Sequence, residues 1–223
     1  MIVSGGVFCP LPAELKRPEW VIACDRGWQY AQRMGLTPDL IVGDFDSSSL
    51  PDTETQVRRY PREKDDTDTM LAAREALEKG FREVVIACAL GGRLDHTLAN
   101  FQTAAFLVRG GARTWLLGTD TEAVAFSHGR VRLPGREGWS LSVFSLTDCC
   151  TGVTIRGTKY RAEHLRLSNC FPIGVSNAWE EDAAEISVES GILLVVQSRL
   201  GPEERFSQEA HFHSGCSSSD SCK

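Results

Sequence analysis

The sequence predicts an α/β protein, in which an N-terminal Rossmann-like domain with a parallel sheet is followed by a small all-β sandwich or barrel. Two observations carry this prediction. Up to about residue 128, strand-like and helix-like segments alternate along the chain, which is typical of a parallel sheet covered by helices on both faces. After residue 128, short strand-like runs follow one another between Gly, Pro, Asn and Asp residues, as in antiparallel sandwiches and barrels.

The first domain is expected to span residues 1–128. Its helices have apolar residues along one face and a glycine as the stop signal, most clearly at 67–80, where Met70, Ala73 and Leu77 precede Gly80. The strands expected here are 20–24, 39–44, 84–90 and 113–117, and the helices are 27–35, 67–80 and 94–110.

The second domain is expected to span residues 129–200 and to consist of strands alone. Its runs are RVRL, SLSVFSL, GVTIRG, KYRAEHLRL, DAAEISVES and ILLVVQS. Residues 201–223 are polar and end in SGCSSSDSCK. Such a segment buries too little apolar surface to order itself, so we predict a disordered tail.

Composition excludes several classes of function. The 223 residues carry a formal net charge of −6, which leaves no basic surface for nucleic acid. No apolar run approaches the roughly 20 residues of a membrane span, and the start lacks a secretory signal, so the sequence predicts a cytoplasmic protein. The chain has eight cysteines, none in CxxC spacing, which disfavours a zinc site. Cys24 and Cys88 lie in apolar runs and are expected to be small buried side chains.

The candidate chemistry lies where strands of the first domain end, because ligands of such sheets bind beyond the carboxyl ends of the strands. Asp44 and Asp46 follow the strand 39–44 two residues apart, so in extended chain both carboxylates point the same way. Gly43 leaves the backbone open to close approach by a ligand. Carboxylates about 4 Å apart repel by roughly 1 kcal/mol in water, and a pair held together therefore indicates a hard divalent cation such as Mg²⁺.

A second acidic group, Asp65, Asp66 and Asp68, begins the helix at 67–80. An acidic residue at a helix start has a structural explanation of its own, as the N-cap or through the helix dipole. Each of these aspartates is therefore open to two interpretations, a cap or a ligand.

The third segment, ALGGRLDHTLAN, passes from a strand through Gly91 and Gly92 to the start of a helix. Flexible glycines before a helix N-terminus form an anion site from backbone amides, and Arg93 adds a permanent cation suited to phosphate oxygens. Asp95 fits three roles, an N-cap, a partner of the acceptor and a metal ligand. His96 fits a proton shuttle less well than a packed or capping histidine.

Together these blocks resemble the thiamine pyrophosphokinase family. VGDFDSS, then KDDTD and GGRLDHTLAN, follow the family's order and spacing, and CDRGWQYAQRMGLTPDL resembles its first block. GWSLSVFSL, GVTIRGTKY and GVSNAW resemble its C-terminal sandwich, so the likeness covers roughly residues 20–197. Arg26 stands where many relatives have a first of two glycines.

The resemblance implies the site residues and the reaction. It implies that the hydroxyl of thiamine attacks the β-phosphorus of ATP and that AMP leaves. Mg²⁺ and the catalytic charges are implied at Asp44, Asp46, Asp68, Arg93 and Asp95, with Asp68 and Asp95 as candidates for the base. The implied ATP and phosphate contacts are Asp25, Gly27, Gly43, Lys64, Thr67, Gly92 and Arg93.

The resemblance also implies a homodimer. Thiamine would bind between the first domain of one subunit and the sandwich of the other, at Tyr160, Ser176 and Asn177. A Ser-Asn pair that merely builds a turn is the alternative.

Two other functions remain open. One is a phosphatase of the haloacid dehalogenase type with Asp44 as the nucleophile, which leaves KDDTD and GGRLDH without a role. The other is a nucleotide-binding sensor without catalysis, which would gain little from so many carboxylates.

Overall fold

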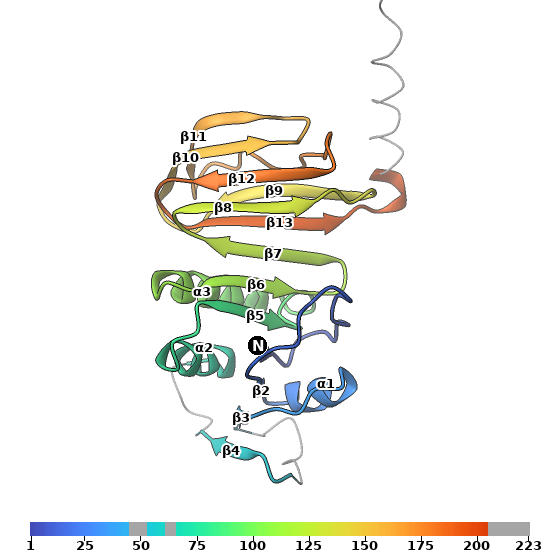
Figure 1. The fold of residues 1–223 in the computed structure, drawn as a ribbon, viewed down its shortest axis with the longest axis vertical. Helices are drawn as coiled ribbons and strands as arrows, with labels where there is room; N and C mark the ends of the chain where they lie inside the picture. Colours follow the sequence, from blue (N-terminus) through green and yellow to red (C-terminus); the bar gives the residue numbers. More distant parts are fainter. Residues whose placement is uncertain (45–52, 61–65, 205–223) are drawn as a thin grey trace, which may run out of the picture.

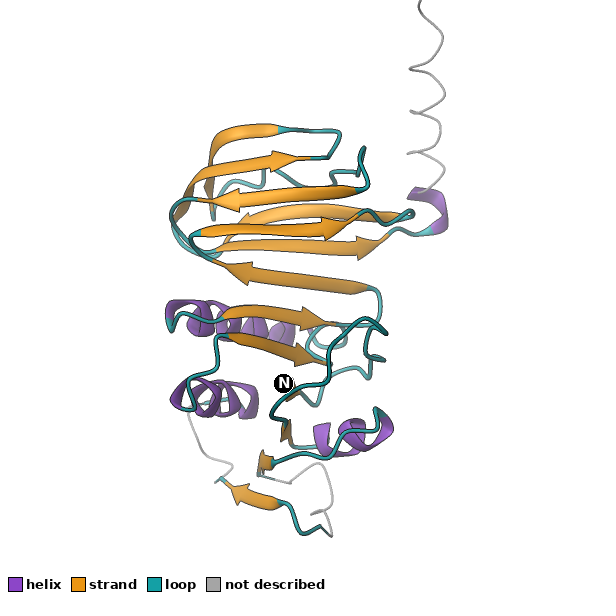
Figure 2. Cartoon of the chain, viewed as in Figure 1, coloured by secondary structure: helices purple, strands orange, loops and turns teal. Residues whose placement is uncertain are grey.

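The computed structural model describes residues 1–44, 53–60 and 66–204. Figures 1 and 2 show an elongated molecule with helices and strands in one half and a β-sandwich in the other, where the sole helical segment drawn is a single turn at residues 202–204. The helices are α1 (Gly27–Arg33), α2 (Asp68–Glu78) and α3 (Leu94–Arg109). The strands are β1 (Ile2–Val3), β2 (Ile22–Cys24), β3 (Leu40–Gly43), β4 (Gln56–Arg59), β5 (Glu83–Ala87), β6 (Arg113–Leu117), β7 (Thr121–Phe126), β8 (Gly129–Pro134), β9 (Trp139–Ser145), β10 (Cys149–Arg156), β11 (Ala162–Ser168), β12 (Ala183–Val188) and β13 (Leu193–Arg199).

Within the described residues the strands form two sheets. The larger has nine strands in the order β4-β3-β2-β1-β5-β6-β7-β13-β9, and the smaller has four in the order β11-β10-β12-β8. The strands from β4 to β6 pair in parallel, whereas β7, β13 and β9 pair antiparallel. The parallel strands therefore share one carboxyl edge.

Both faces of the parallel part are covered. In β1, Ile2 packs in the core that α2 and α3 close, while its neighbour Val3 packs with Ala31 of α1 on the opposite face. The irregular segment between β1 and β2 covers the α1 face further along, where Cys9, Cys88 and Leu117 are buried together. This segment packs against Val85 of β5 and Leu117 of β6.

The sandwich shares its inner sheet with the α/β half. Val124 and Phe126 of β7 pack in the sandwich core, while Ala123 and Ala125 face the core closed by α3. Strand β13, which lies between β7 and β9, is buried on both faces in the same way, and this explains its unbroken apolar run LLVV.

The predicted fold class is confirmed, and each expected helix and strand overlaps an observed one. The sequence did not predict β1, β4 or β7. The predicted domain boundary at residue 128 falls in the turn between β7 and β8, and the large sheet continues across it through β13. The predicted disordered tail lies mostly outside the described residues. None of the described helices is long and apolar enough to span a membrane.

Candidate active site

A cavity of about 570 Å³ opens at the carboxyl edge of the parallel strands. Residues directly after β1, β2, β3 and β5 reach it, together with the first turns of α2 and α3. The described residues that line it are Ser4, Gly5, Gly6, Val7, Cys24, Asp25, Arg26, Asp44, Thr67, Asp68, Thr69, Ala89, Gly91, Gly92, Arg93, His96 and Asn100. Side chains from three sequence blocks thus meet in one space, as the strand-end rule predicts.

Asp25 follows β2 with its backbone in the left-handed region, at a φ of 47°. Its N–H donates to the Val42 carbonyl at 2.8 Å. Left-handed backbone is uncommon outside glycine, although Asp tolerates it better than most residues, and strain of this kind concentrates at functional sites. Gly43 packs against this turn, since a Cβ there would lie 3.2 Å from the Asp25 Cα. The close approach expected at Gly43 is therefore made by Asp25.

At the start of α2, the residue that caps the helix is not one of the acidic residues. Thr67 is the N-cap, because its hydroxyl accepts from the Met70 N–H at 3.2 Å. Asp66 forms an ion pair with Arg74 at 3.1 Å and does not line the cavity. Asp68 is the first helical residue and does line it. The cap interpretation thus falls on Thr67, and Asp68 faces the cavity with Asp44.

Gly91 and Gly92 have φ angles of 89° and 72° and turn the chain from β5 into α3. Arg93 follows at the rim, where its side chain is 74% exposed and forms a two-bond ion pair with Asp95, at 3.1 Å from Nε and 2.5 Å from Nη2. The hydrogen bond from Arg93 holds the pKa of Asp95 below its ordinary value. Asp95 thus orients the guanidinium, and it is outside the cavity lining.

The sequence did not point to Ser4–Val7, which form one wall of the cavity. The Ser4 hydroxyl lies 3.0 Å from that of Thr69. On the opposite side, the Asn100 amide donates to the Ala89 carbonyl at 2.7 Å. The available signal was a short apolar pair, Ile2–Val3, followed by Ser-Gly-Gly, the same strand-then-glycine pattern that marked Gly91 and Gly92.

The other predicted contacts lie elsewhere. Gly27 starts α1 against β1, where an added Cβ would lie 2.1 Å from the Val3 carbonyl oxygen, so the position needs glycine for packing. Asp46 and Lys64 lie outside the described residues. Among the residues that are described, no group of three potential metal ligands gathers. Asp44 and Asp68 fit Mg²⁺, because this ion usually takes one or two carboxylates and completes its shell with phosphates and water.

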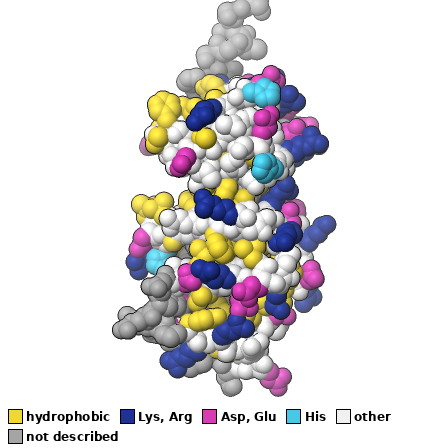
Figure 3. All heavy atoms as spheres, turned by 90° about the vertical axis from the view of Figure 1, so that its left-hand side faces the viewer, with side chains coloured by type: hydrophobic (Ala, Val, Ile, Leu, Met, Phe, Trp, Pro, Cys, Tyr) yellow, Lys and Arg dark blue, Asp and Glu magenta, His cyan; other side chains and the backbone are white. Residues whose placement is uncertain are grey.

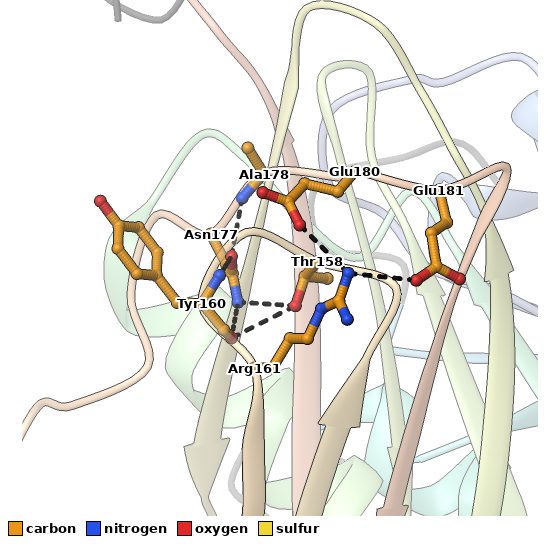
Figure 4. A network of polar contacts seen from close by, with 7 residues as sticks. All are labelled: Thr158, Tyr160, Arg161, Asn177, Ala178, Glu180 and Glu181. Atoms are coloured by element: carbon orange, nitrogen blue, oxygen red, sulfur yellow. Dashed lines mark hydrogen bonds and ion pairs between the residues drawn. The ribbon is translucent and has the colours of Figure 1, made fainter. Parts of the chain in front are cut away.

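The residues predicted to bind thiamine lie in the sandwich, and none of them lines the cavity of the same chain. Figure 4 shows the buried Asn177 amide between residues 158–160 and Ala178. Its Nδ2 donates to the Thr158 hydroxyl at 3.1 Å and the Tyr160 carbonyl at 2.7 Å. Its Oδ1 accepts from the N–H groups of Tyr160 at 2.9 Å and Ala178 at 3.0 Å. The amide thus holds the loop that carries Tyr160.

Tyr160 itself is 62% exposed. The next residue, Arg161, forms ion pairs with Glu180 and Glu181, at 3.3 Å each. These ion pairs connect the loop of Tyr160 to the segment that follows Trp179. Ser176 has a φ of 58°, and its N–H donates to the Ser142 hydroxyl at 3.0 Å. The structure therefore presents the Tyr160 ring and the Ser176 side chain outward on a well-tethered scaffold.

Comparison with known proteins gives a consistent result. Residues 11–116 match the family model described as thiamin pyrophosphokinase, catalytic domain, and residues 130–193 match thiamin pyrophosphokinase, vitamin B1 binding domain. A thiamine pyrophosphokinase from Bacillus subtilis is 28% identical over a 188-residue alignment that covers 79% of this chain and 86% of that protein.

Solved structures agree in fold. A crystal structure of thiamine pyrophosphokinase from Bacillus subtilis has a TM-score of 0.77 at 25% identity, covering 89% of this chain and 97% of that one. A thiamin pyrophosphokinase family protein from Enterococcus faecalis has a TM-score of 0.72 at 29% identity, covering 90% and 98%.

Proposed function

Because the chain belongs to the thiamin pyrophosphokinase family and is thus an enzyme that passes the pyrophosphate group of ATP to thiamine, we propose that this transfer takes place in the cavity at the carboxyl edge of the large sheet. The observation that carries the proposal is the convergence of Asp44, Asp68 and Arg93 on that cavity. They come from the end of β3, the first turn of α2 and the loop between β5 and α3. Such an arrangement offers both an acidic and a basic side to a polyphosphate.

The chain's own residues position the ATP phosphates and the thiamine hydroxyl and balance the charge of the phosphates. Backbone amides around Gly91 and Gly92 and the Arg93 guanidinium would bind the phosphates, and Asp44, Asp46 and Asp68 would hold Mg²⁺ through carboxylate oxygens. When bound, Mg²⁺ neutralises charge on the phosphates. The thiamine hydroxyl oxygen forms a bond to the β-phosphorus of ATP. The bond between that phosphorus and the oxygen that bridges it to the α-phosphorus breaks, and AMP departs with this oxygen. Phosphoryl-type transfer of this kind depends mainly on positioning and electrostatics.

A carboxylate accepts the proton of the attacking hydroxyl. Asp68 lines the cavity, whereas Asp95 lies outside its lining. We therefore favour Asp68 over Asp95 for this role.

Product analysis tests the function. The protein is incubated with ATP, Mg²⁺ and thiamine, and the nucleotides and thiamine esters are separated by chromatography. Equal amounts of AMP and thiamine diphosphate support the proposal. Release of inorganic phosphate without thiamine would instead indicate the phosphatase, and binding of ATP without turnover would indicate the sensor.

We further propose a homodimer in which each site combines the cavity of one subunit with the sandwich of the other. Two observations support it. No described residue of the sandwich lines the cavity of its own chain, and large hydrophobic side chains are exposed in both halves, at Leu94 and Leu98 of α3 and at Tyr160, Phe171 and Val175. Figure 3 shows exposed hydrophobic side chains over both halves of one face, and such surface commonly marks an interface.

The cytoplasmic location of the protein also stays a prediction.

Mixing an inactive variant with a variant that binds thiamine poorly tests the shared site. Asp44→Asn removes a cavity carboxylate and Tyr160→Ala removes the exposed ring, so a mixed dimer with shared sites has one site carrying both changes and one intact site. After full exchange at equal amounts, we expect about a quarter of wild-type activity, measured at low thiamine. Confirmed subunit exchange with no recovered activity would place each whole site in one chain.

The Asn177 amide is expected to act on thiamine through Tyr160. Asn177→Ala leaves the Tyr160 N–H and carbonyl without their partner, so we expect a loss of about 2 kcal/mol of stability and a thiamine KM raised roughly tenfold, equivalent to about 1.4 kcal/mol. The ATP KM should change little, because the phosphates bind in the other half. Kinetics and thermal melting measure both effects.

Tyr160→Ala provides the matched control, since it removes the ring from an exposed position without emptying the buried amide site. It should raise the thiamine KM to a similar extent and leave the melting temperature nearly unchanged. The double variant should then have the KM of either single variant. Additive effects on KM would mean that Asn177 contacts thiamine independently of Tyr160.

A further inference from the structure

Two cysteines that are 79 positions apart in the sequence meet behind the cavity. The Sγ atoms of Cys9 and Cys88 lie 3.8 Å apart. Each backbone N–H donates to the sulfur of the other residue, Cys9 N–H at 3.4 Å and Cys88 N–H at 3.3 Å. The Cys9 thiol also lies 3.5 Å from the Leu117 carbonyl. Reciprocal bonds of this kind hold the two sulfurs facing each other.

Both side chains are 0% exposed, in a cluster that includes Leu117 and the segment between β1 and β2. The segment between β1 and β2 contains no helix or strand, so its local opening costs less free energy than separating strands of the sheet. Such opening lets small oxidants reach the two buried thiols, although burial slows their access. The prediction that Cys88 is a buried side chain is confirmed.

The pair connects two walls of the cavity. Val7, two residues before Cys9, and Ala89, directly after Cys88, both line it. The walls touch, since a Cβ on Gly6 would lie 2.4 Å from the Cys88 carbonyl oxygen, and a Cβ on Gly92 would lie 3.2 Å from Val7 Cγ2. A movement of the backbone at Cys9 or Cys88 therefore also moves residues that line the cavity.

We propose that Cys9 and Cys88 are a redox modification site, which a peroxide converts to a disulfide and a thiol reductant restores. A disulfide has a sulfur–sulfur bond of about 2.05 Å, so the two sulfurs, which lie 3.8 Å apart in the reduced protein, must move toward each other. The irregular segment carrying Cys9 supplies this movement, whereas Cys88 follows β5 directly and is held by the sheet.

The chemistry balances with hydrogen peroxide as the oxidant. The Cys9 thiolate attacks one peroxide oxygen, the O–O bond breaks, and a sulfenic acid and water result after proton transfer. The Cys88 sulfur then attacks the Cys9 sulfur, the S–O bond breaks, and a second water leaves with the Cys88 proton. Two electrons pass from the thiols to one peroxide molecule, giving one disulfide and two waters.

The two thiols differ in their place in the fold. Cys9 lies on the irregular segment, whose opening exposes it to an oxidant, whereas Cys88 directly follows β5 and is held by the sheet. Cys9 is thus the attacking thiol and Cys88 the resolving thiol. The hydrogen bond between the two lowers the pKa of Cys9, and the same bond together with burial raises the pKa of Cys88, which agrees with these roles.

The expected consequence rests on the proposed function of the cavity. A cross-link that shifts one wall by an ångström or so misplaces the phosphate-binding loop, and such shifts cost up to about a hundredfold in turnover. We expect the oxidised enzyme to lose at least about nine-tenths of its activity, and dithiothreitol to restore it. The melting temperature of the oxidised form should rise, because the cross-link restricts the unfolded chain.

The test treats the full chain with hydrogen peroxide, blocks free thiols with iodoacetamide, and maps peptides without reduction. Cys9→Ser, Cys9→Ala and Cys88→Ser are compared with Cys170→Ser, a control that removes an exposed thiol of the sandwich. The wild type and Cys170→Ser should give the Cys9–Cys88 linked peptide and lose activity reversibly. The variants at Cys9 and Cys88 should keep their activity in peroxide.

Cys9 and Cys88 recovered as alkylated thiols, while Cys170 is oxidised, would overturn the proposal. A linked peptide with unchanged activity would contradict the claim that the disulfide inactivates the site in the cavity. Peptide mapping and melting do not depend on the reaction, so an untreated protein that forms no AMP would refute the proposed function while leaving the disulfide open to the same test.

Discussion

Asp44→Asn is expected to lower kcat by a factor on the order of 10³, because it removes a ligand oxygen charge worth several kcal/mol in the transition state. Asp44 lines the cavity directly after β3, together with Asp68. Steady-state kinetics with ATP and thiamine at saturating Mg²⁺ measure the effect. Asp46→Asn should behave similarly if both carboxylates serve the same ion.

The fold should survive this change. Asp44→Asn removes one negative charge from a cavity that Asp44 shares with Asp68 and so reduces like-charge repulsion. The melting temperature without Mg²⁺ should therefore hold or rise. Asp66→Asn is the matched control, since it makes the same substitution at a residue that pairs with Arg74 outside the cavity. The control should keep its activity within about twofold. Near-normal activity of Asp44→Asn would remove this residue from the site.

Arg93→Ala is expected to lower kcat by roughly 10²–10³, the usual cost of losing one donor to developing charge. The reason is its place at the cavity rim beside Gly91 and Gly92, with Asp95 fixing its orientation. Arg93→Lys should recover only part of the loss, because an ammonium lacks the planar fork that binds two phosphate oxygens.

The control for Arg93 is Arg156→Ala in the sandwich. Arg156 forms an ion pair with Glu163 at 3.3 Å, and both pairs are largely exposed. Exposed pairs contribute little to stability, so both variants should melt near the wild-type temperature and differ in kinetics alone. An equal loss of activity in the two would indicate a general effect of removing surface charge.

Local patterns in the sequence were enough to predict the α/β and all-β halves. The helix at 67–80 and the strand at 39–44 are specified by nearby apolar residues and stop signals, so they need no knowledge of the rest of the chain. Strand order has no such local signal. The insertion of β13 between β7 and β9 joins residues from both halves, and β1 is too short, at two residues, to show a period.

The acidic and basic parts of the candidate site were predictable because they follow strand ends. Asp44 and Arg93 needed only the rule that parallel strands end at one edge. The wall at Ser4–Val7 was missed because its strand was missed. Asn177 shows a different limit, since an amide that binds a ring and one that ties two loops together look identical in sequence. The contact between Cys9 and Cys88 depends entirely on the folded topology.

The central claim is that the cavity holds Mg²⁺ and the ATP phosphates. It is tested most directly by a crystal structure with Mg²⁺, thiamine and an ATP analogue whose bridge between the α- and β-phosphorus is not cleaved. We predict a metal ion about 2.1 Å from a carboxylate oxygen of Asp44, phosphates beside Gly91, Gly92 and Arg93, and thiamine against Tyr160 of the second subunit. Phosphates bound elsewhere, with the cavity empty, would contradict this claim.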